Sequence, residues 1–176
     1  SGFASLPKAF AAAEDGGFNA VEFMEYSFVA TQEHPEHRPE NFQETMRWYY
    51  PHQPFRPHLI RAWRRCADRV DLASTGGHEA RFPGRHVYPD YFVLKHYTYT
   101  SRQRAIDRLV HMTFDPSEAN MHGFRHHIQE ADIVLPTERQ LRRYTSDAEL
   151  DPSSPRTRRF IAERAHQREN ISQGSI

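Results

Sequence analysis

The strongest strand pattern in the chain is FNAVEFMEYSFVA, residues 18–30. Aromatic and aliphatic side chains occupy alternate positions on one face, and Val21, Phe23 and Val29 occupy the other. A strand that is apolar on both faces is usually covered on both faces. A second pattern of this kind is YFVLKHY, residues 91–97. We therefore expect both segments to be strands of one sheet.

Shorter patterns predict the elements around these two strands. Residues 5–15 have the apolar spacing of a helix that Gly16-Gly17 ends, and Ser101 is the expected N-cap of another helix. Weaker patterns are a strand at 58–63, a hairpin joining 80–82 to 86–88 across Pro83-Gly84, and a capping box formed by Thr137 and Gln140. Strands that alternate with helices favour an α/β fold with a mixed sheet and flanking helices.

Changes in composition divide the chain into three predicted parts. Residues 1–145 contain the α/β domain, and residues 146–155, SDAELDPSSP, have the composition of a linker. Residues 156–176 are expected to form a basic C-terminal helix and a disordered tail.

The overall composition excludes several classes of protein. The 176 residues carry 23 basic and 23 acidic side chains, so bulk charge gives no argument for nucleic-acid binding. No apolar run approaches the roughly 18 residues of a membrane span. A single cysteine, Cys66, fits a reducing compartment, and we expect a cytoplasmic protein. Only Lys8 and Lys95 are lysines, which fits either codon bias or recognition of phosphate and carboxylate by arginine.

The densest group of chemistry-bearing side chains is STGGHEARFPGR, residues 74–85. A histidine beside a carboxylate, here His78 and Glu79, suits a general base or a metal ligand. Arg81 and Arg85 follow closely and suit oxyanion binding. A turn with solvated polar residues at the entry of a hairpin explains the same pattern, so both interpretations stay open.

Two further groups of histidines stand out. Lys95-His96-Tyr97 ends a predicted strand shortly before a helix N-terminus, a place where α/β sheets often bind phosphate. A half-buried strand histidine is the structural alternative. His122 and His126 are four residues apart, which on a helix would present two nitrogens to one metal ion. The second pair supports a weaker hypothesis, a metal-dependent hydrolase.

Several segments together resemble one enzyme family. They are GFNAVEF at 17–23, IRAWRR at 60–65, VDLASTGGHEARF at 70–82, VYP at 87–89, and LKHY at 94–97 followed by Thr100-Ser101. In this order they resemble the C-terminal, acceptor-side half of bacterial family-2-like glycosyltransferases with a GT-A fold, over roughly residues 5–130. The resemblance implies transfer of a sugar from a nucleotide-sugar donor to an acceptor hydroxyl, such as that of a sugar or a glycan.

The resemblance also implies roles for individual residues. Glu79 would be the base for the acceptor hydroxyl, with His78 as a second catalytic residue. His96 would be a ligand of a divalent cation, Mn²⁺ or Mg²⁺. The residues expected to contact the donor are Arg81, Arg85, Lys95 and Tyr97. Trp63, like Tyr97, offers a flat surface on which a sugar ring can stack.

The sequence departs from the family pattern at two places. No Asp-x-Asp-like metal motif precedes residue 5, and Gly123-Phe124-Arg125 stands where a Gly-Trp-His type segment is expected. We therefore expect either a segment of a longer enzyme, whose N-terminal half supplies donor binding, or a protein without donor binding. A non-catalytic module that binds carbohydrate or protein is the alternative function.

Overall fold

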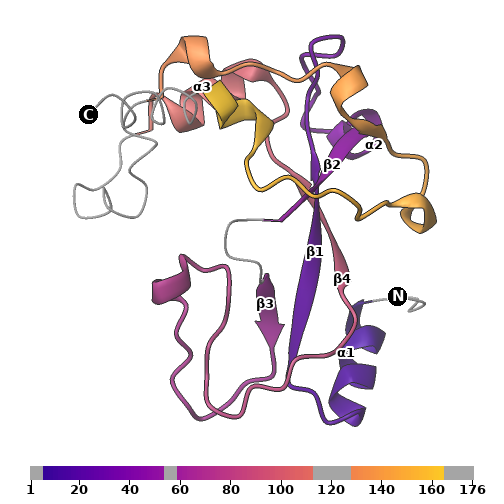
Figure 1. Cartoon of the computed structure of the whole chain (residues 1–176), viewed down its shortest axis with the longest axis vertical. Coiled ribbons are helices and arrows are strands. Elements are labelled where there is room, and N and C mark those ends of the chain that lie inside the picture. The colour runs from indigo at the N-terminus through magenta and orange to yellow at the C-terminus, as the bar shows by residue number, and fades with distance from the viewer. Residues whose placement is uncertain (1–5, 54–58, 113–127, 165–176) are drawn as a thin grey trace. The chain divides into compact units, whose positions relative to one another are not determined.

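The computed structural model describes residues 6–53, 59–112 and 128–164 (Figure 1). Its α-helices are α1 (Leu6–Asp15), α2 (Phe42–Thr45) and α3 (Arg102–Leu109), and its strands are β1 (Ala20–Phe28), β2 (Trp48–His52), β3 (Ile60–Trp63), β4 (Phe92–Tyr97) and β5 (Arg142–Arg143). The described strands form one sheet in the order β3-β1-β2-β5, and β4 pairs with β1. The prediction that residues 18–28 and 91–97 share a sheet is therefore confirmed.

The predicted α/β fold, a mixed sheet with flanking helices like half of a GT-A domain, is wrong. The sheet is mainly antiparallel: β1 pairs antiparallel with β3, and β2 with β5. The described helices are short, with four to ten residues each. The prediction was based on strands that alternate with helices along the chain, whereas the doubly apolar strands require only an apolar cover of any kind. Here loops and 3-10 turns supply much of that cover.

The chain divides into two compact units. Unit 1 comprises Ser1–Glu25 and Gln53–Leu94, and unit 2 comprises Tyr26–His52 and Lys95–Ile176. In unit 1, α1 packs Ala9 and Ala13 against Val21 of β1 and Phe92 of β4. A second cluster joins Ala20, Ile60 and Ala80, so the loop after β3 covers the opposite side of the strands. Figure 1 shows α1 beside β4 and this long loop beside β3.

Unit 2 has an apolar cluster on α3 and an aromatic one on β1. Ser101 caps α3, its hydroxyl accepting a hydrogen bond from the Arg104 amide at 3.1 Å, which confirms the predicted N-cap. Members of the α3 cluster are Ala30, Ala105, Ile106, Leu109, Ile128, Ile133, Leu135 and Ile161. On β1, Phe28 is fully buried and contacts the rings of Tyr49 and Tyr97.

Other predicted elements have mixed outcomes. The helix α1, the strand β3 and the Thr137–Gln140 capping box are confirmed. The hairpin between 80–82 and 86–88 is wrong, because Arg81 bridges to Asp71 and Val87 bridges to Ala20. Strand β2 was missed because Pro51 lies inside it, and proline argues against a strand.

Residues 146–155, predicted to be a linker, make several hydrogen bonds within unit 2. The Tyr49 hydroxyl accepts from the Asp151 amide at 3.1 Å, and Arg142 donates to the Asp151 carbonyl at 2.6 Å. After them, Phe160 packs against Val29 and Tyr50. The predicted boundaries at 145 and 155 lie inside unit 2 and stay predictions. Of the segment 156–176, predicted to be a basic helix and a tail, the described part contains a 3-10 helix at Phe160–Ala162, and residues 165–176 lie outside the described residues.

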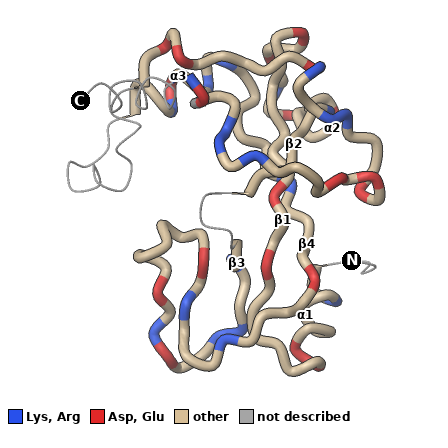
Figure 2. Tube along the Cα trace, in the orientation of Figure 1, with Lys and Arg blue, Asp and Glu red and all other residues tan. Residues whose placement is uncertain are grey.

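Basic and acidic residues are interspersed along the trace of both units (Figure 2). Among the described residues, no helix combines the length and the apolar composition needed to cross a bilayer.

Candidate functional site

Glu79 is the centre of a buried ionic cluster in unit 1. Its side chain is 7% exposed, and both of its oxygens accept hydrogen bonds from arginine. Arg81 donates to Oε2 from Nε at 2.9 Å and from Nη2 at 2.8 Å. Arg85 donates to Oε1 at 2.8 Å and to the Ala80 carbonyl at 2.6 Å. We call these three ionised residues, Glu79, Arg81 and Arg85, the Glu79 cluster.

The electrostatics of the Glu79 cluster favour an ionised carboxylate. Burial raises the pKa of Glu79, but the hydrogen bonds and charges of Arg81 and Arg85 outweigh it, so the pKa lies below its ordinary value. A carboxylate with both oxygens occupied is a poor proton acceptor. Arg81 is 51% exposed, whereas Arg85 is 25% exposed, so Arg81 is the partner that can leave more easily. The base role of Glu79 stays a prediction.

The loop that carries Glu79, residues 71–85, is held by local hydrogen bonds. The Thr75 hydroxyl is buried, accepts from the Glu79 amide at 3.2 Å and donates to the Glu79 carbonyl at 2.9 Å. Gly76 and Gly77 have φ of 61° and 78°, which glycine adopts without strain. The Asp71 carboxylate accepts from the Ser74 hydroxyl and amide, and these bonds lower the pKa of Asp71. The loop is therefore preorganised.

His78 is hydrogen-bonded to Arg61 of β3. The distance from Arg61 Nη2 to His78 Nδ1 is 3.1 Å. A guanidinium has donors only, so Nδ1 is the acceptor and the neutral ring carries its proton on Nε2. In this tautomer the Nε2 atom of His78 carries a hydrogen rather than a lone pair. Its chemistry fits donation to an oxyanion better than proton abstraction.

The predicted donor residues on β4, Lys95 and Tyr97, lie in unit 2 on one face of the strand. Lys95 donates to the Tyr144 hydroxyl at 2.9 Å and forms an ion pair with Asp147. Burial lowers the pKa of Lys95, but these two partners outweigh it and raise the pKa overall. Tyr97 is on the same face, stacked on Phe28 with ring centroids 4.8 Å apart, and burial raises its pKa. Both side chains belong to a packed aromatic cluster.

His96 lies on the other face of β4. Arg159 Nη2 is 3.4 Å from His96 Nδ1, and Arg159 Nη1 donates to the buried Ser27 hydroxyl at 2.9 Å. A guanidinium next to the imidazole disfavours a second cation there and favours an anion. Among the described residues, no group of three or more His, Cys, Asp or Glu side chains could hold a metal ion. The role of His96 as a metal ligand stays a prediction.

The predicted site is thus divided between the two units. Unit 1 brings Arg81 and Arg85 onto Glu79 and places His78 beside Arg61; unit 2 contains Lys95, His96 and Tyr97. Trp63 is partly buried and packs against the apolar cluster of Ala20, Ile60 and Ala80. The pair His122 and His126 lies outside the described residues.

Sequence reasoning missed the arginines that pair with the two histidines. Arg61 is 17 residues from His78, and Arg159 is 63 residues from His96. Only strand pairing could have found the first, because Ile60 bridges to Glu79. Nothing in the sequence pattern indicates the second.

Comparison with known proteins provides no further assignment. No protein-family model, no curated protein and no solved structure matches this chain significantly.

Proposed function

We propose that this chain is the acceptor-side segment of a glycosyltransferase that moves a sugar from a nucleotide-sugar donor to an acceptor hydroxyl. The observation that carries the proposal is the preorganised loop 71–85, with a buried carboxylate held by two arginines. Glycosyl transfer needs a base for the acceptor and cations for the leaving diphosphate. The loop contains both kinds of group within a few residues of each other.

In this proposal, Arg81 couples donor binding to activation of Glu79. A phosphate oxygen competes with Glu79 for the guanidinium of Arg81, the more exposed of its two partners. When Arg81 moves to the phosphate, Oε2 of Glu79 loses two hydrogen bonds and one adjacent positive charge. The pKa of Glu79 then rises toward its ordinary value, and the free oxygen can accept the proton of the acceptor hydroxyl.

His78 and His96 are assigned to oxyanion contacts in this proposal. Each accepts a hydrogen bond from arginine at Nδ1, so each arginine–histidine pair is a local source of positive charge and of N–H donors. A Mn²⁺ or Mg²⁺ ion would balance the diphosphate, and its oxygen ligands would come from outside the residues described here. The single cysteine supports a cytoplasmic location.

A second candidate, a non-catalytic carbohydrate- or protein-binding module, is favoured by one observation. Both oxygens of Glu79 are already occupied, which suits a purely structural carboxylate. Such a module would bind glycan without turnover, and loss of Glu79 would lower stability alone.

The test is transfer activity with a panel of nucleotide sugars, measured on this chain and on a longer protein that contains it. In an active preparation, Glu79→Gln is expected to lower kcat about 10²–10⁴-fold and to tighten donor binding slightly, because it removes the carboxylate that competes with the donor for Arg81. Asp90→Asn, an exposed carboxylate of the same unit, is the control. Glycan binding without turnover in either protein would favour the binding module, and full activity of Glu79→Gln would remove Glu79 as the base.

A further inference from the structure

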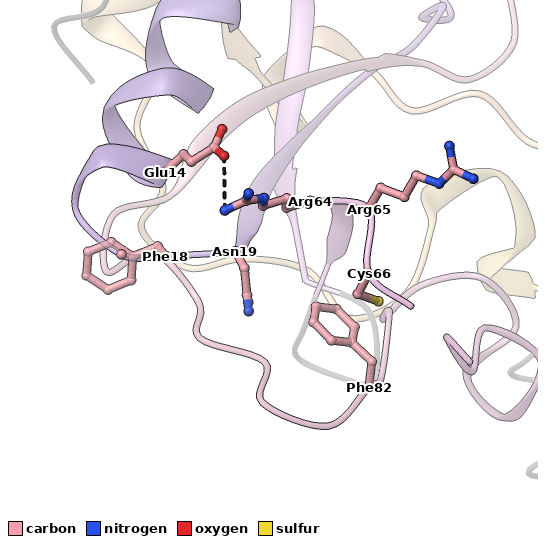
Figure 3. Close-up of a pocket in the computed structure, with 8 residues that line it drawn as sticks. Glu14, Phe18, Asn19, Arg64, Arg65, Cys66 and Phe82 are labelled. Atoms are coloured by element: carbon pink, nitrogen blue, oxygen red, sulfur yellow. Dashed lines mark ion pairs between the residues drawn. The ribbon is translucent and has the colours of Figure 1, made fainter. Parts of the chain in front are cut away.

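A small pocket in unit 1 lies apart from the residues assigned above. Its volume is about 200 Å³, below the roughly 300–1,000 Å³ of pockets for drug-sized ligands. It is lined by Glu14, Gly17, Phe18, Asn19, Arg64, Arg65, Cys66 and Phe82. Figure 3 shows Arg64 turned toward Glu14, with the Cys66 thiol and the Phe82 ring next to each other. The size fits a ligand no larger than a monosaccharide.

The walls of the pocket are fixed by hydrogen bonds. The Asn19 side chain donates to the Gly84 carbonyl at 2.9 Å and accepts from the His86 amide at 2.7 Å. The Arg64 amide donates to the Asn19 carbonyl at 2.8 Å, which holds the backbone of Arg64 in place. Phe18 stacks against His86, with ring centroids 4.5 Å apart. The pocket wall around Asn19 and the backbone of Arg64 is therefore fixed. The guanidinium of Arg64 is held by an exposed ion pair and can exchange one anionic partner for another.

The charge at the pocket is positive overall. Arg64 forms an ion pair with Glu14 at 3.1 Å, but the two side chains are 67% and 52% exposed. An exposed pair of this kind is weak, so a ligand oxyanion can compete with Glu14 for the guanidinium. Arg65 adds a second positive charge, and within the described part of the chain it has no ion-pair partner. The pocket lining therefore contains two arginines and one carboxylate.

We infer that this pocket binds a monosaccharide-sized ligand that carries an oxyanion, a phosphate or a carboxylate. Arg64 contacts the oxyanion, Arg65 supplies additional positive charge, and the Phe82 ring offers an apolar surface to the sugar ring. Glu14 is an internal competitor that occupies Arg64 when the ligand is absent. The inference does not depend on the proposed function.

Binding is measured by calorimetry with glucose 6-phosphate and glucuronate, and with glucose and inorganic phosphate as the separate parts. We expect either anionic sugar to bind at least about tenfold more tightly than glucose or phosphate alone. The ranking of the two sugars distinguishes phosphate from carboxylate. Cys66 is the only cysteine and lines the pocket, so saturating ligand should also slow its alkylation by iodoacetamide.

Variants of Arg64 and Glu14 are expected to change the affinity for the anionic sugar in opposite directions. Arg64→Gln should weaken binding at least about tenfold, whereas Glu14→Gln should tighten it about two- to fivefold by removing the competitor. Arg69→Gln, an exposed arginine outside the pocket, is the matched control, and equal melting temperatures confirm folding. Unchanged Cys66 alkylation, wild-type affinity of Arg64→Gln, or phosphate alone binding as tightly as the sugars would each overturn the inference.

Discussion

Glu79 illustrates how one residue can serve either chemistry or stability. The same three charges to which we assign the proposed chemistry also hold the loop 71–85 in place, because Glu79 is buried and each arginine reaches it from a different position of the loop. Removing the carboxylate charge leaves two guanidinium groups with weakened partners. The stability of unit 1 and the proposed chemistry can therefore be separated only by measuring both.

Glu79→Gln is expected to lower the free energy of unfolding by about 1–3 kcal/mol, because three hydrogen bonds to a charged acceptor are weakened or lost. Urea denaturation followed by circular dichroism measures the change. Asp90→Asn, an exposed residue of the same unit, should stay within about 0.5 kcal/mol of the wild type. Equal stability of Glu79→Gln and the wild type would show that the cluster is not a structural element.

The lowered pKa of Glu79 also predicts a pH dependence. Because the folded-state pKa lies below its ordinary value of 4.5, the contribution of Glu79 to stability is complete above that value. It is lost as the pH falls through the folded-state pKa. The melting temperature of the wild type should therefore fall more steeply than that of Glu79→Gln below about pH 4.5. Parallel curves for the two proteins would contradict the assigned pKa direction.

At the scale of elements, strand alternation decides which side chains can share a ligand. Lys95 and Tyr97 belong to the aromatic face of β4, where Phe28 and Tyr144 pack, and His96 faces Arg159 instead. Three consecutive residues of a strand cannot all point to one side. A ligand on one face of β4 therefore cannot contact Lys95, His96 and Tyr97 together, although all three side chains can donate hydrogen bonds to an oxyanion.

The segment 146–155 allows a test of whether Arg142 holds a predicted linker against unit 2. Arg142 donates to the carbonyls of Asp151 and Ser153 at 2.6 and 2.8 Å and to the Ser153 hydroxyl at 3.0 Å. Arg142→Gln should open the segment and speed its cleavage by proteinase K about tenfold. The neighbouring Arg143→Gln is the control, since Arg143 is exposed. Cleavage sites are identified by mass spectrometry, and equal rates in the two variants would favour the free linker expected from composition.

At the scale of the whole molecule, the division into two units follows the strands rather than the ends of the chain. The boundary falls inside β1, after Glu25, and inside β4, after Leu94. Each unit has its own buried clusters, one set on α1 and the loop after β3, and the other on α3 and the aromatic residues of β1. The chain starts in unit 1, passes into unit 2 at Tyr26, returns to unit 1 at Gln53 and passes into unit 2 again at Lys95.

Divalent cations test the chemistry of the chain as a whole. Hard cations need several oxygen ligands, and the described residues contain no group of three candidate ligands. Millimolar Mn²⁺ or Mg²⁺ should therefore change the melting temperature of the 176-residue chain by less than about 1 °C, with no transfer from a nucleotide sugar. Mg²⁺ with EDTA in excess is the control. Metal-dependent turnover by this chain alone would show that the cation site lies within it.

Local patterns alone were sufficient to predict several elements. Alternating apolar residues predicted β1 and β4, helical spacing predicted α1, and a serine before an amphipathic helix predicted the cap of α3. These features depend on neighbours close in the sequence, and their physical causes act within one turn or one strand. The grouping of His78, Glu79, Arg81 and Arg85 in unit 1 was predictable for the same reason.

The remaining features depend on contacts between distant segments, which no local pattern encodes. Apolar faces on β1 required a cover, and the antiparallel pairing with β3 and the packing of loops on the strands determined what that cover is. Arg159 reaches His96 across 63 residues, and the pocket beside Arg64 joins α1 to the chain after β3. Local sequence therefore determined the elements and their chemistry, while tertiary packing determined which charges meet, because burial and pairing arise only after distant segments come together.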